Sequence, residues 1–311
     1  MNTFTDNYFT INPQVQEALD QGRPVVALES TVITHGLPYP DNLTTAKAME
    51  DAVREGGALP ATIGVISGEI YVGLNDDQLA YLAGRANEGV RKCSRRDLPL
   101  VLAGGLDGGT TVAATMLLAH RAGISIFATG GIGGVHRGHP FDVSADLTEL
   151  SRTPVAVVCS GAKSVLDLPA TLEVLETNGV PVIGLGTDEM PAFFSRGSGL
   201  AAPSRLDTAA EVAEAILAHR ALGLRNGLVV AVPVPEQDEF DPEQAEAAIE
   251  QVTKEADALG LKGPETTPWL LSRLAELTDG DSLRANVALL ANNGRVAAEI
   301  AVALAGRSSE S

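Results

Sequence analysis

The sequence is poor in aromatic side chains, in cysteine and in positive charge. Aromatic residues make up 4% of the 311 residues, and the two cysteines are Cys93 and Cys159. Two cysteines in so long a chain do not form a disulfide framework, so we expect buried apolar thiols in a reducing compartment. The formal net charge is −18. This acidity argues against nucleic acid or an anionic membrane surface as a partner and favours a small molecule.

Long hydrophobic runs are also missing. No stretch approaches the roughly 20 apolar residues needed to span a bilayer. The first residues, MNTFTDNYFTINPQ, lack the positive and apolar regions of a secretory signal. We therefore expect a cytoplasmic protein with no membrane partner.

Short apolar runs that alternate with segments of helical spacing are the main feature of the sequence. Most runs lack in-and-out alternation, which suits strands covered on both faces. The alternation predicts an α/β fold, a three-layer α/β/α arrangement with a largely parallel, mixed sheet. The predicted strands lie in residues 24–31, 61–67, 98–105, 124–131, 154–161, 180–187 and 227–235.

Helix cap signals support this interpretation and help to delimit the helices. They occur at Asn75 with Gln78, at Asp241 with Pro242 and Gln244 before a helix that ends near Gly260, and at Thr267 with Pro268. There is no internal repeat and no long linker, so we expect a single domain over residues 1–311. Its C-terminal part, about 241–306, is mainly helical by pattern and packs on one side of the sheet or serves a subunit interface.

One lysine directly follows a predicted strand. In VVCSGAKSVLDL (157–168), Lys163 lies two residues beyond Gly161, where we expect the first turn of the next helix. Parallel sheets bind ligands beyond the carboxyl ends of their strands. The helix dipole and partial burial would both destabilise an ammonium there and favour a nucleophilic amine. The alternative is a lysine that extends to solvent without a role.

A glutamate ends the first predicted strand. Glu29 interrupts the apolar run VVALEST, where an ionised carboxylate costs several kcal/mol unless it is paired or hydrogen-bonded. We therefore expect it to have a partner. It is either part of a structural salt bridge or cap, or a general acid that burial keeps protonated.

Two glycine-rich segments and one basic segment are candidates for anion binding. Residues 103–112 and 128–138 resemble loops whose backbone N–H groups face an anion. The second segment lacks the dinucleotide-binding spacing, and CSGAKS lacks the P-loop spacing, which excludes a P-loop kinase. The basic segment, 90–99, is either a solvated loop or a docking site for an anionic substrate. Its cations are Arg91, Lys92, Arg95 and Arg96.

An oxygen-rich segment is the candidate metal site. FDVSADLTEL (141–150) carries Asp142, Ser144 and Asp146 in alternation, so an extended backbone would direct all three to one side. Oxygen ligands suit Mg²⁺ or Mn²⁺, and the lack of a Cys/His cluster argues against structural zinc. His136 and His139 are an alternative metal pair.

Taken together, these segments resemble the pseudouridine-5′-phosphate glycosidase family, which is also associated with indigoidine pigment gene clusters. The resemblance runs from Pro24 to about Ile300. Its main carriers are VALESTVITHGLPYP, RKCSRRDLP, GGTTVAATM, FATGGIGGVHRG, FDVSADLTEL, VVCSGAKSVLDLPATLEVLET, PAFFSR and GDSLRANVALLANN. It implies an enzyme that reversibly cleaves the C–C glycosidic bond of pseudouridine 5′-phosphate to give uracil and ribose 5-phosphate. It also implies one Mn²⁺ per subunit and a homotrimer.

The resemblance further implies roles for individual residues. Glu29 would be the proton donor, Lys163 the nucleophile that forms an imine with the sugar, and Asp142 the metal ligand. Ser160, beside the lysine, stands where the family has alanine. The implied substrate contacts are Lys92, the Val112 backbone, Ser144, Ala145 and Asp146, with Asn286 as a further contact.

Two other functions stay open at this point. One is an N-nucleoside hydrolase that acts through Glu29 and Asp146 without an imine. The other is a sugar-phosphate-binding accessory protein that uses the basic segment and the glycine loops. A sensor has no need of a desolvated amine opposite a desolvated acid, which favours an enzyme.

Overall fold

A large mixed sheet forms the centre of the computed structural model, which describes residues 8–86, 88–261 and 266–308. Within these residues the sheet has eleven strands. Nine follow one another in the order β1 (Phe9–Ile11), β4 (Glu69–Val72), β3 (Leu59–Ile66), β2 (Val25–Leu28), β7 (Ile126–Ala128), β10 (Ala156–Cys159), β14 (Leu228–Ala231), β12 (Val182–Leu185) and β13 (Ser204–Leu206). From β3 to β13 all neighbours are parallel. β4 and β6 (Gly108–Thr110) run antiparallel to β3, and β5 (Arg91–Cys93) pairs with β6.

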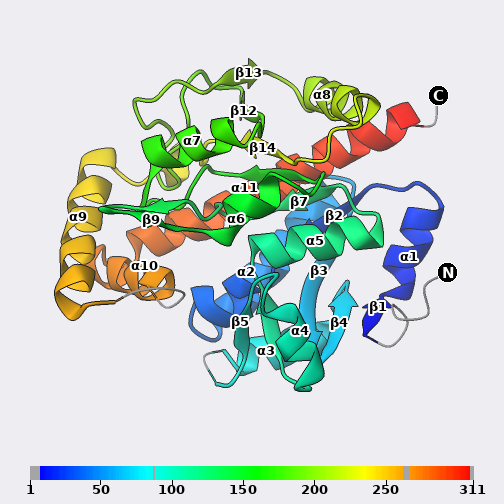
Figure 1. Ribbon diagram of the computed structural model, residues 1–311, viewed down its shortest axis with the longest axis horizontal. Coiled ribbons are helices and arrows are strands. Elements are labelled where there is room, and N and C mark those ends of the chain that lie inside the picture. Colours follow the sequence, from blue (N-terminus) through cyan, green and yellow to red (C-terminus); the bar gives the residue numbers. More distant parts are fainter. Residues whose placement is uncertain (1–7, 87, 262–265, 309–311) are drawn as a thin grey trace.

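Helices cover both faces of this sheet, which confirms the predicted three-layer α/β/α fold (Figure 1). Crossover connections between parallel strands are right-handed. Connections that lead in opposite directions across the sheet therefore lie on opposite faces. One layer holds α2 (Asp41–Glu55), α8 (Ala209–Ala221) and α11 (Asp281–Ser308), and the other holds α5 (Val112–Ala122), α6 (Ala145–Leu150) and α7 (Leu168–Thr177). The remaining helices are α1 (Pro13–Asp20), α3 (Asp76–Gly84), α4 (Leu98–Ala103), α9 (Pro242–Leu259) and α10 (Thr266–Leu277).

The central strands are buried along their whole length, as their unbroken apolar runs predict. Every residue of β2, β7, β10 and β14 is buried. Among the described helices, α11 is the one that is long and apolar enough to cross a membrane by length and composition. It packs instead against α2, α8 and the central strands, so its apolar face belongs to the core.

Most of the predicted helix signals are found in the structure. Asn75 and Gln78 form a reciprocal capping box, and the Asp241 side chain accepts the N–H of Gln244 at 2.9 Å. α9 then ends at Gly260, which has a φ of +67° that favours glycine. α10 begins at Thr266, one residue before the predicted cap.

The strand predicted at 98–105 is wrong, because this segment forms α4. The run LPLVLA is rich in leucine, a good helix former, and its proline lies in the first turn, where a missing N–H is tolerated. The pattern of a short apolar run did not distinguish a buried strand from a short helix.

A small antiparallel sheet lies beside the main one. It consists of β11 (Leu166–Asp167), β8 (Val135–His136) and β9 (His139–Val143). The β8–β9 hairpin extends toward α9 (Figure 1), where Arg137 forms an ion pair with Glu246 and His139 lies 3.1 Å from Asp257. Helices α9, α10 and α11 account for the mainly helical C-terminal part that the sequence predicts.

Candidate active site

Three neighbouring parallel strands end at the same edge of the sheet and bring the candidate residues together. β2 pairs with β7, and β7 pairs with β10. The residues that follow their carboxyl ends are Glu29 after β2, Thr129 after β7 and the loop 160–163 after β10. This arrangement places Glu29 and Lys163, 134 positions apart in the sequence, around one cavity.

Two adjoining cavities open at this edge. The inner recess, about 60 Å³, is bordered by apolar side chains of Phe193, Leu271 and Leu290 and by the Asn286 amide. The outer chamber, about 300 Å³, is bordered by the N-terminal residues of α5 and α6 and by the β8–β9 hairpin. Four residues line both cavities: Glu29, Thr31, Lys92 and Lys163. The predicted acid and the predicted nucleophile therefore stand where the two cavities meet.

Glu29 is buried and hydrogen-bonded, as its position in the sequence predicts. Glu29 is 5% exposed. The Thr31 hydroxyl donates to Oε2, and the Thr129 hydroxyl donates to Oε1. Two hydroxyl groups thus fix the plane of the carboxyl group while the same residue lines the inner recess and the outer chamber.

Lys163 is not in the first turn of a helix, which corrects the sequence-based expectation. α7 begins only at Leu168, and Lys163 lies in a loop tied to the glycine segment. The Lys163 N–H donates to the Ile132 carbonyl, and the Ile132 N–H donates to the Gly161 carbonyl, both at 3.1 Å. Gly161 has a φ of +85°, and a Cβ there would lie 2.5 Å from the Pro191 carbonyl oxygen. This bridge, rather than the first turn of a helix, sets the position of the Lys163 backbone.

Lys92 and His35 give the junction its electrostatic character. Burial lowers the pKa of Lys92, and the nearby charge of Lys163 lowers it further, to about 8. Burial and the charge of Lys92 lower the pKa of His35 to about 4, so its imidazole is neutral at pH 7. Two amines and a neutral imidazole form an environment that attracts an anion and disfavours a further proton.

The segment with alternating oxygens is only partly extended. β9 ends at Val143, Ser144 caps α6 and Asp146 lies in the first helical turn. All three oxygen-bearing residues, Asp142, Ser144 and Asp146, nevertheless line the outer chamber. Asp146 is buried, and its carboxylate accepts the N–H of Ala113 at 3.0 Å and of Gly133 at 2.8 Å. It therefore holds the start of α5 against the glycine segment.

The basic segment divides between two roles. Lys92 and Arg96 line the outer chamber, together with Ser94 and the cap of α5 at Thr111 and Val112. Arg95 instead pairs at 2.8 Å with Glu149, whose side chain is 0% exposed. Two of the four predicted cations therefore border the outer chamber.

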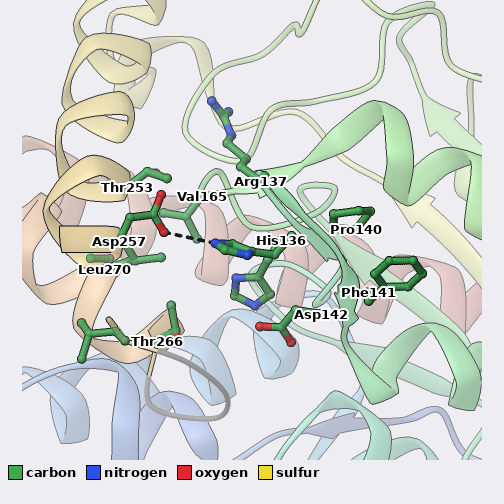
Figure 2. A pocket seen from close by; sticks show the side chains of 14 residues that line it. His136, Arg137, Pro140, Phe141, Asp142, Val165, Thr253, Asp257, Thr266 and Leu270 are labelled. Carbon is green, nitrogen blue, oxygen red and sulfur yellow. Dashed lines mark hydrogen bonds and ion pairs between the residues drawn. The ribbon is translucent and has the colours of Figure 1, made fainter. Parts of the chain in front are cut away.

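Asp142 and His136 are the candidate metal donors. Both line the outer chamber and a further cavity of about 610 Å³ on the other side of the hairpin, which Figure 2 shows. Burial lowers the pKa of His136, which favours the neutral ring that binds metals. Within the described residues no group of three or more His, Cys, Asp or Glu side chains could hold a metal ion. One carboxylate and one imidazole fit an ion such as Mn²⁺ or Mg²⁺, which retains water or substrate oxygens in its shell.

In the alternative pair of His136 and His139, the Nε2 atom of His139 lies 3.1 Å from Asp257, and this pair stays a prediction. On the same hairpin Phe141 is 98% exposed and points away from Asp142 (Figure 2).

Several residues of the site were not singled out from the sequence. Thr129 and Thr31 hold the carboxyl group of Glu29, His35 borders the inner recess, and Phe193 forms part of its wall with a φ of +67°. Thr129 lies where the predicted strand 124–131 overlaps the glycine-rich segment 128–138, but neither pattern points to its contact with Glu29. A bulky residue with positive φ is rare and often marks a functional site, but the backbone angle is not visible in a sequence.

Comparison with known proteins gives a consistent result. Residues 14–303 match the model of a family described as indigoidine synthase A like protein. A pseudouridine-5′-phosphate glycosidase from Solibacter usitatus is 57% identical over 299 residues, which cover 96% of this chain and 99% of the relative. One from Caldanaerobacter subterraneus is 53% identical and covers 98% of both chains.

Two solved structures are similar over nearly the whole chain. The prealnumycin C-glycosynthase AlnA, in complex with ribulose 5-phosphate, has a TM-score of 0.90 and 40% sequence identity, and the match covers 98% of this chain and 100% of that one. An indigoidine synthase A-like protein from Thermotoga maritima has a TM-score of 0.87 and 39% identity, with coverage of 96% and 97%.

Proposed function

Since the chain belongs to the family of indigoidine synthase A like proteins, we propose that it is a pseudouridine-5′-phosphate glycosidase that works through a lysine imine. The observation that carries this proposal is the placement of Glu29 and Lys163 at the junction of the inner recess and the outer chamber. Relatives with this name match over almost their full length. The resemblance in the sequence is thereby confirmed at the level of the family.

The two cavities suit the two ends of the substrate. The outer chamber offers Lys92, Arg96 and the backbone at the start of α5, which suit a phosphate group. The inner recess offers apolar walls and the Asn286 amide, which suit the flat, hydrogen-bonding uracil ring. The pentose would then lie between Glu29 and Lys163. The sugar phosphate bound to AlnA is consistent with a phosphosugar site in this fold.

The C–C link explains the need for an amine. Cleavage of an ordinary N-glycoside is assisted by the leaving nitrogen, whereas the uracil carbon of pseudouridine leaves poorly. In the proposed reaction the Lys163 nitrogen forms a bond to C1′. The bond from C1′ to the ring oxygen breaks, and that oxygen takes a proton from Glu29.

Cleavage of the glycosidic bond follows. The nitrogen, now an ammonium, first gives a proton to the Glu29 carboxylate. Its freed lone pair then forms a double bond to C1′ while the electron pair of the C–C bond goes to uracil, whose carbon takes up that proton. Water then hydrolyses the imine, which releases ribose 5-phosphate and the free lysine. Because each step is reversible, the same residues serve synthesis.

Asp142, with His136 beside it, would hold the Mn²⁺ that the family resemblance implies. When bound there, the ion would neutralise charge on an oxygen ligand in the outer chamber. Asp142 borders the outer chamber from the hairpin, and Lys92 and Arg96 border it from the basic segment.

We also propose a homotrimer in the cytoplasm. The nearly fully exposed Phe141 is an apolar side chain that a subunit contact would cover. Cys93 and Cys159 are buried free thiols, and burial raises the pKa of each to about 12, which suits a reducing compartment. Light scattering on the purified protein would measure the subunit number directly.

The test is release of uracil from pseudouridine 5′-phosphate, followed by its absorbance, for the wild type and Lys163→Ala with and without Mn²⁺. The proposal expects turnover by the wild type and a loss of several orders of magnitude in the variant. Appreciable turnover by Lys163→Ala would favour a hydrolase that uses Glu29 without an imine. No turnover by the wild type under any metal condition would indicate a binding protein.

A further inference from the structure

A fully buried asparagine links the ends of two strands that carry the candidate site. Asn293 lies on α11, is 0% exposed and donates from Nδ2 to the Thr129 carbonyl at 2.9 Å. The same nitrogen lies 3.4 Å from the Gly130 carbonyl and 3.1 Å from the Ser160 hydroxyl. The Ser160 hydroxyl in turn donates to Asn293 Oδ1 at 3.3 Å. The amide thus contacts the chain beyond β7 and beyond β10 at once.

Both contacted segments support a proposed reacting group, one through a hydrogen bond and the other along the chain. The Thr129 hydroxyl donates to Glu29, so the residue whose carbonyl Asn293 holds also orients the proposed acid. Ser160 begins the loop that presents Lys163, and its N–H donates to the Gly130 carbonyl at 2.8 Å. Asn293 therefore connects the support of the acid to the support of the amine.

The packing around Asn293 depends on a close approach of α11 to the ends of the strands. A Cβ at Gly130 would lie 3.1 Å from Leu290 and 3.2 Å from Leu289, so the glycine lets α11 approach the strand ends closely. A buried amide is unfavourable in a protein unless its polar atoms are hydrogen-bonded. An apolar side chain would meet the demands of packing alone, as Leu289 and Leu290 do one turn earlier on the same helix.

We propose that Asn293 is a positioning residue, which sets the separation between the carboxyl group of Glu29 and the amine of Lys163. It does not line the inner recess or the outer chamber and acts through Thr129 and Ser160. This inference rests on the proposed function, because the required separation is the one at which C1′ can be attacked while the ring oxygen receives a proton. A displacement of about 1 Å in such a pair lowers a rate by on the order of 100-fold.

The test uses Asn293→Leu and Asn293→Asp, with Asn292→Leu as the matched control. Asn292 is the neighbouring residue on α11; its amide reaches the Pro233 carbonyl at 3.4 Å, and neither residue lines the inner recess or the outer chamber. For Asn293→Leu we expect kcat for uracil release to fall about 100-fold while KM for pseudouridine 5′-phosphate stays within about threefold. Asn293→Asp, which lacks the amide donor, should show the same split, and Asn292→Leu should keep the wild-type kcat.

A milder variant protects the test against loss of folding. Ser160→Ala removes the two contacts between the Ser160 hydroxyl and the amide and leaves the contacts of the amide with the Thr129 and Gly130 carbonyls. It should lower kcat by less than Asn293→Leu without a change in KM. If Asn293→Leu is unfolded by circular dichroism, Asn293→Asp and Ser160→Ala decide the question.

The outcomes separate this inference from the proposed function. Wild-type kcat in folded Asn293 variants, or an equal fall in Asn292→Leu, would overturn the positioning role while uracil release by the wild type upholds the glycosidase. Absence of uracil release by the wild type would overturn both. A fall in kcat with unchanged KM, confined to Asn293 and Ser160, is the result that the inference predicts.

Discussion

Lys92 and Lys163 line the same two cavities, and the charge of Lys163 contributes, after burial, to lowering the pKa of Lys92 to about 8. Two amines at one junction repel each other when both are charged. With a pKa of about 8, Lys92 still carries most of its charge at pH 7, which suits a role in binding a phosphate.

The lowered pKa of Lys92 predicts a pH dependence for substrate capture. Lys92 is charged below pH 8 and loses its charge as the pH rises through about 8, so kcat/KM for pseudouridine 5′-phosphate should fall above that pH. Lys92→Arg keeps a charge throughout this range and should move the fall to higher pH. The pH profile of kcat/KM for Lys92→Met should not show this fall. A profile of Lys92→Met that matches the wild type would show that the fall belongs to another group.

Glu29→Gln tests the proton donor. Glutamine preserves the size of the side chain, and its amide oxygen can accept a hydrogen bond from Thr31 or Thr129. Its side chain cannot protonate the ring oxygen. We expect kcat to fall by about 10²–10⁴ with a small change in KM. Thr31→Val, which removes one contact to the carboxyl group, should have a smaller effect. A glutamine variant with wild-type kcat would assign the proton to another residue.

Asp146→Asn separates the glycosidase from the carboxylate-based hydrolase. Both oxygens of Asp146 accept backbone N–H groups, so an amide would turn one N–H acceptor into a donor. We expect a loss of about 1–3 kcal/mol in the free energy of unfolding, seen as a lower Tm. Asp167→Asn, at the cap of α7, is the matched control for losing a capping carboxylate. A large loss of kcat at unchanged Tm would instead support direct participation of Asp146 in the reaction.

Asp142→Ala tests the proposed metal site. Removing the carboxylate should raise the Mn²⁺ concentration for half-maximal binding by about tenfold or more, measured by electron paramagnetic resonance of free Mn²⁺. Asp257→Asn, on α9 and in contact with His139 of the same hairpin, should bind Mn²⁺ as the wild type does. Equal Mn²⁺ binding by Asp142→Ala and the wild type would place the ion elsewhere.

The sequence predicted the layers of the fold and the placement of Glu29 and Lys163 at one edge of the sheet for a physical reason. Unbroken apolar runs identify strands covered on both faces, and the residues after such strands meet at one edge. Glu29 and Lys163 were therefore recognisable from their positions after β2 and β10. The same reasoning failed at Leu98–Ala103, where a run of six residues satisfies a strand or a helix equally well.

Other parts of the site depend on contacts that local sequence does not encode. The loop of Lys163 is fixed by a bridge to Ile132, 31 positions away, rather than by a helix start. Asn293 is held by carbonyl groups more than 160 positions away. Such residues become visible only when α11 is placed against the strand ends.

The most direct test of the lysine imine is chemical trapping. The protein is incubated with ribose 5-phosphate, reduced with borohydride, digested and analysed by mass spectrometry, with Lys163→Arg treated in parallel. If Lys163 forms the imine, we expect a reduced pentose phosphate adduct on the peptide that contains Lys163, and none at that position in the variant. An unmodified Lys163, or an adduct on Lys92 instead, under conditions in which the enzyme turns over would contradict it.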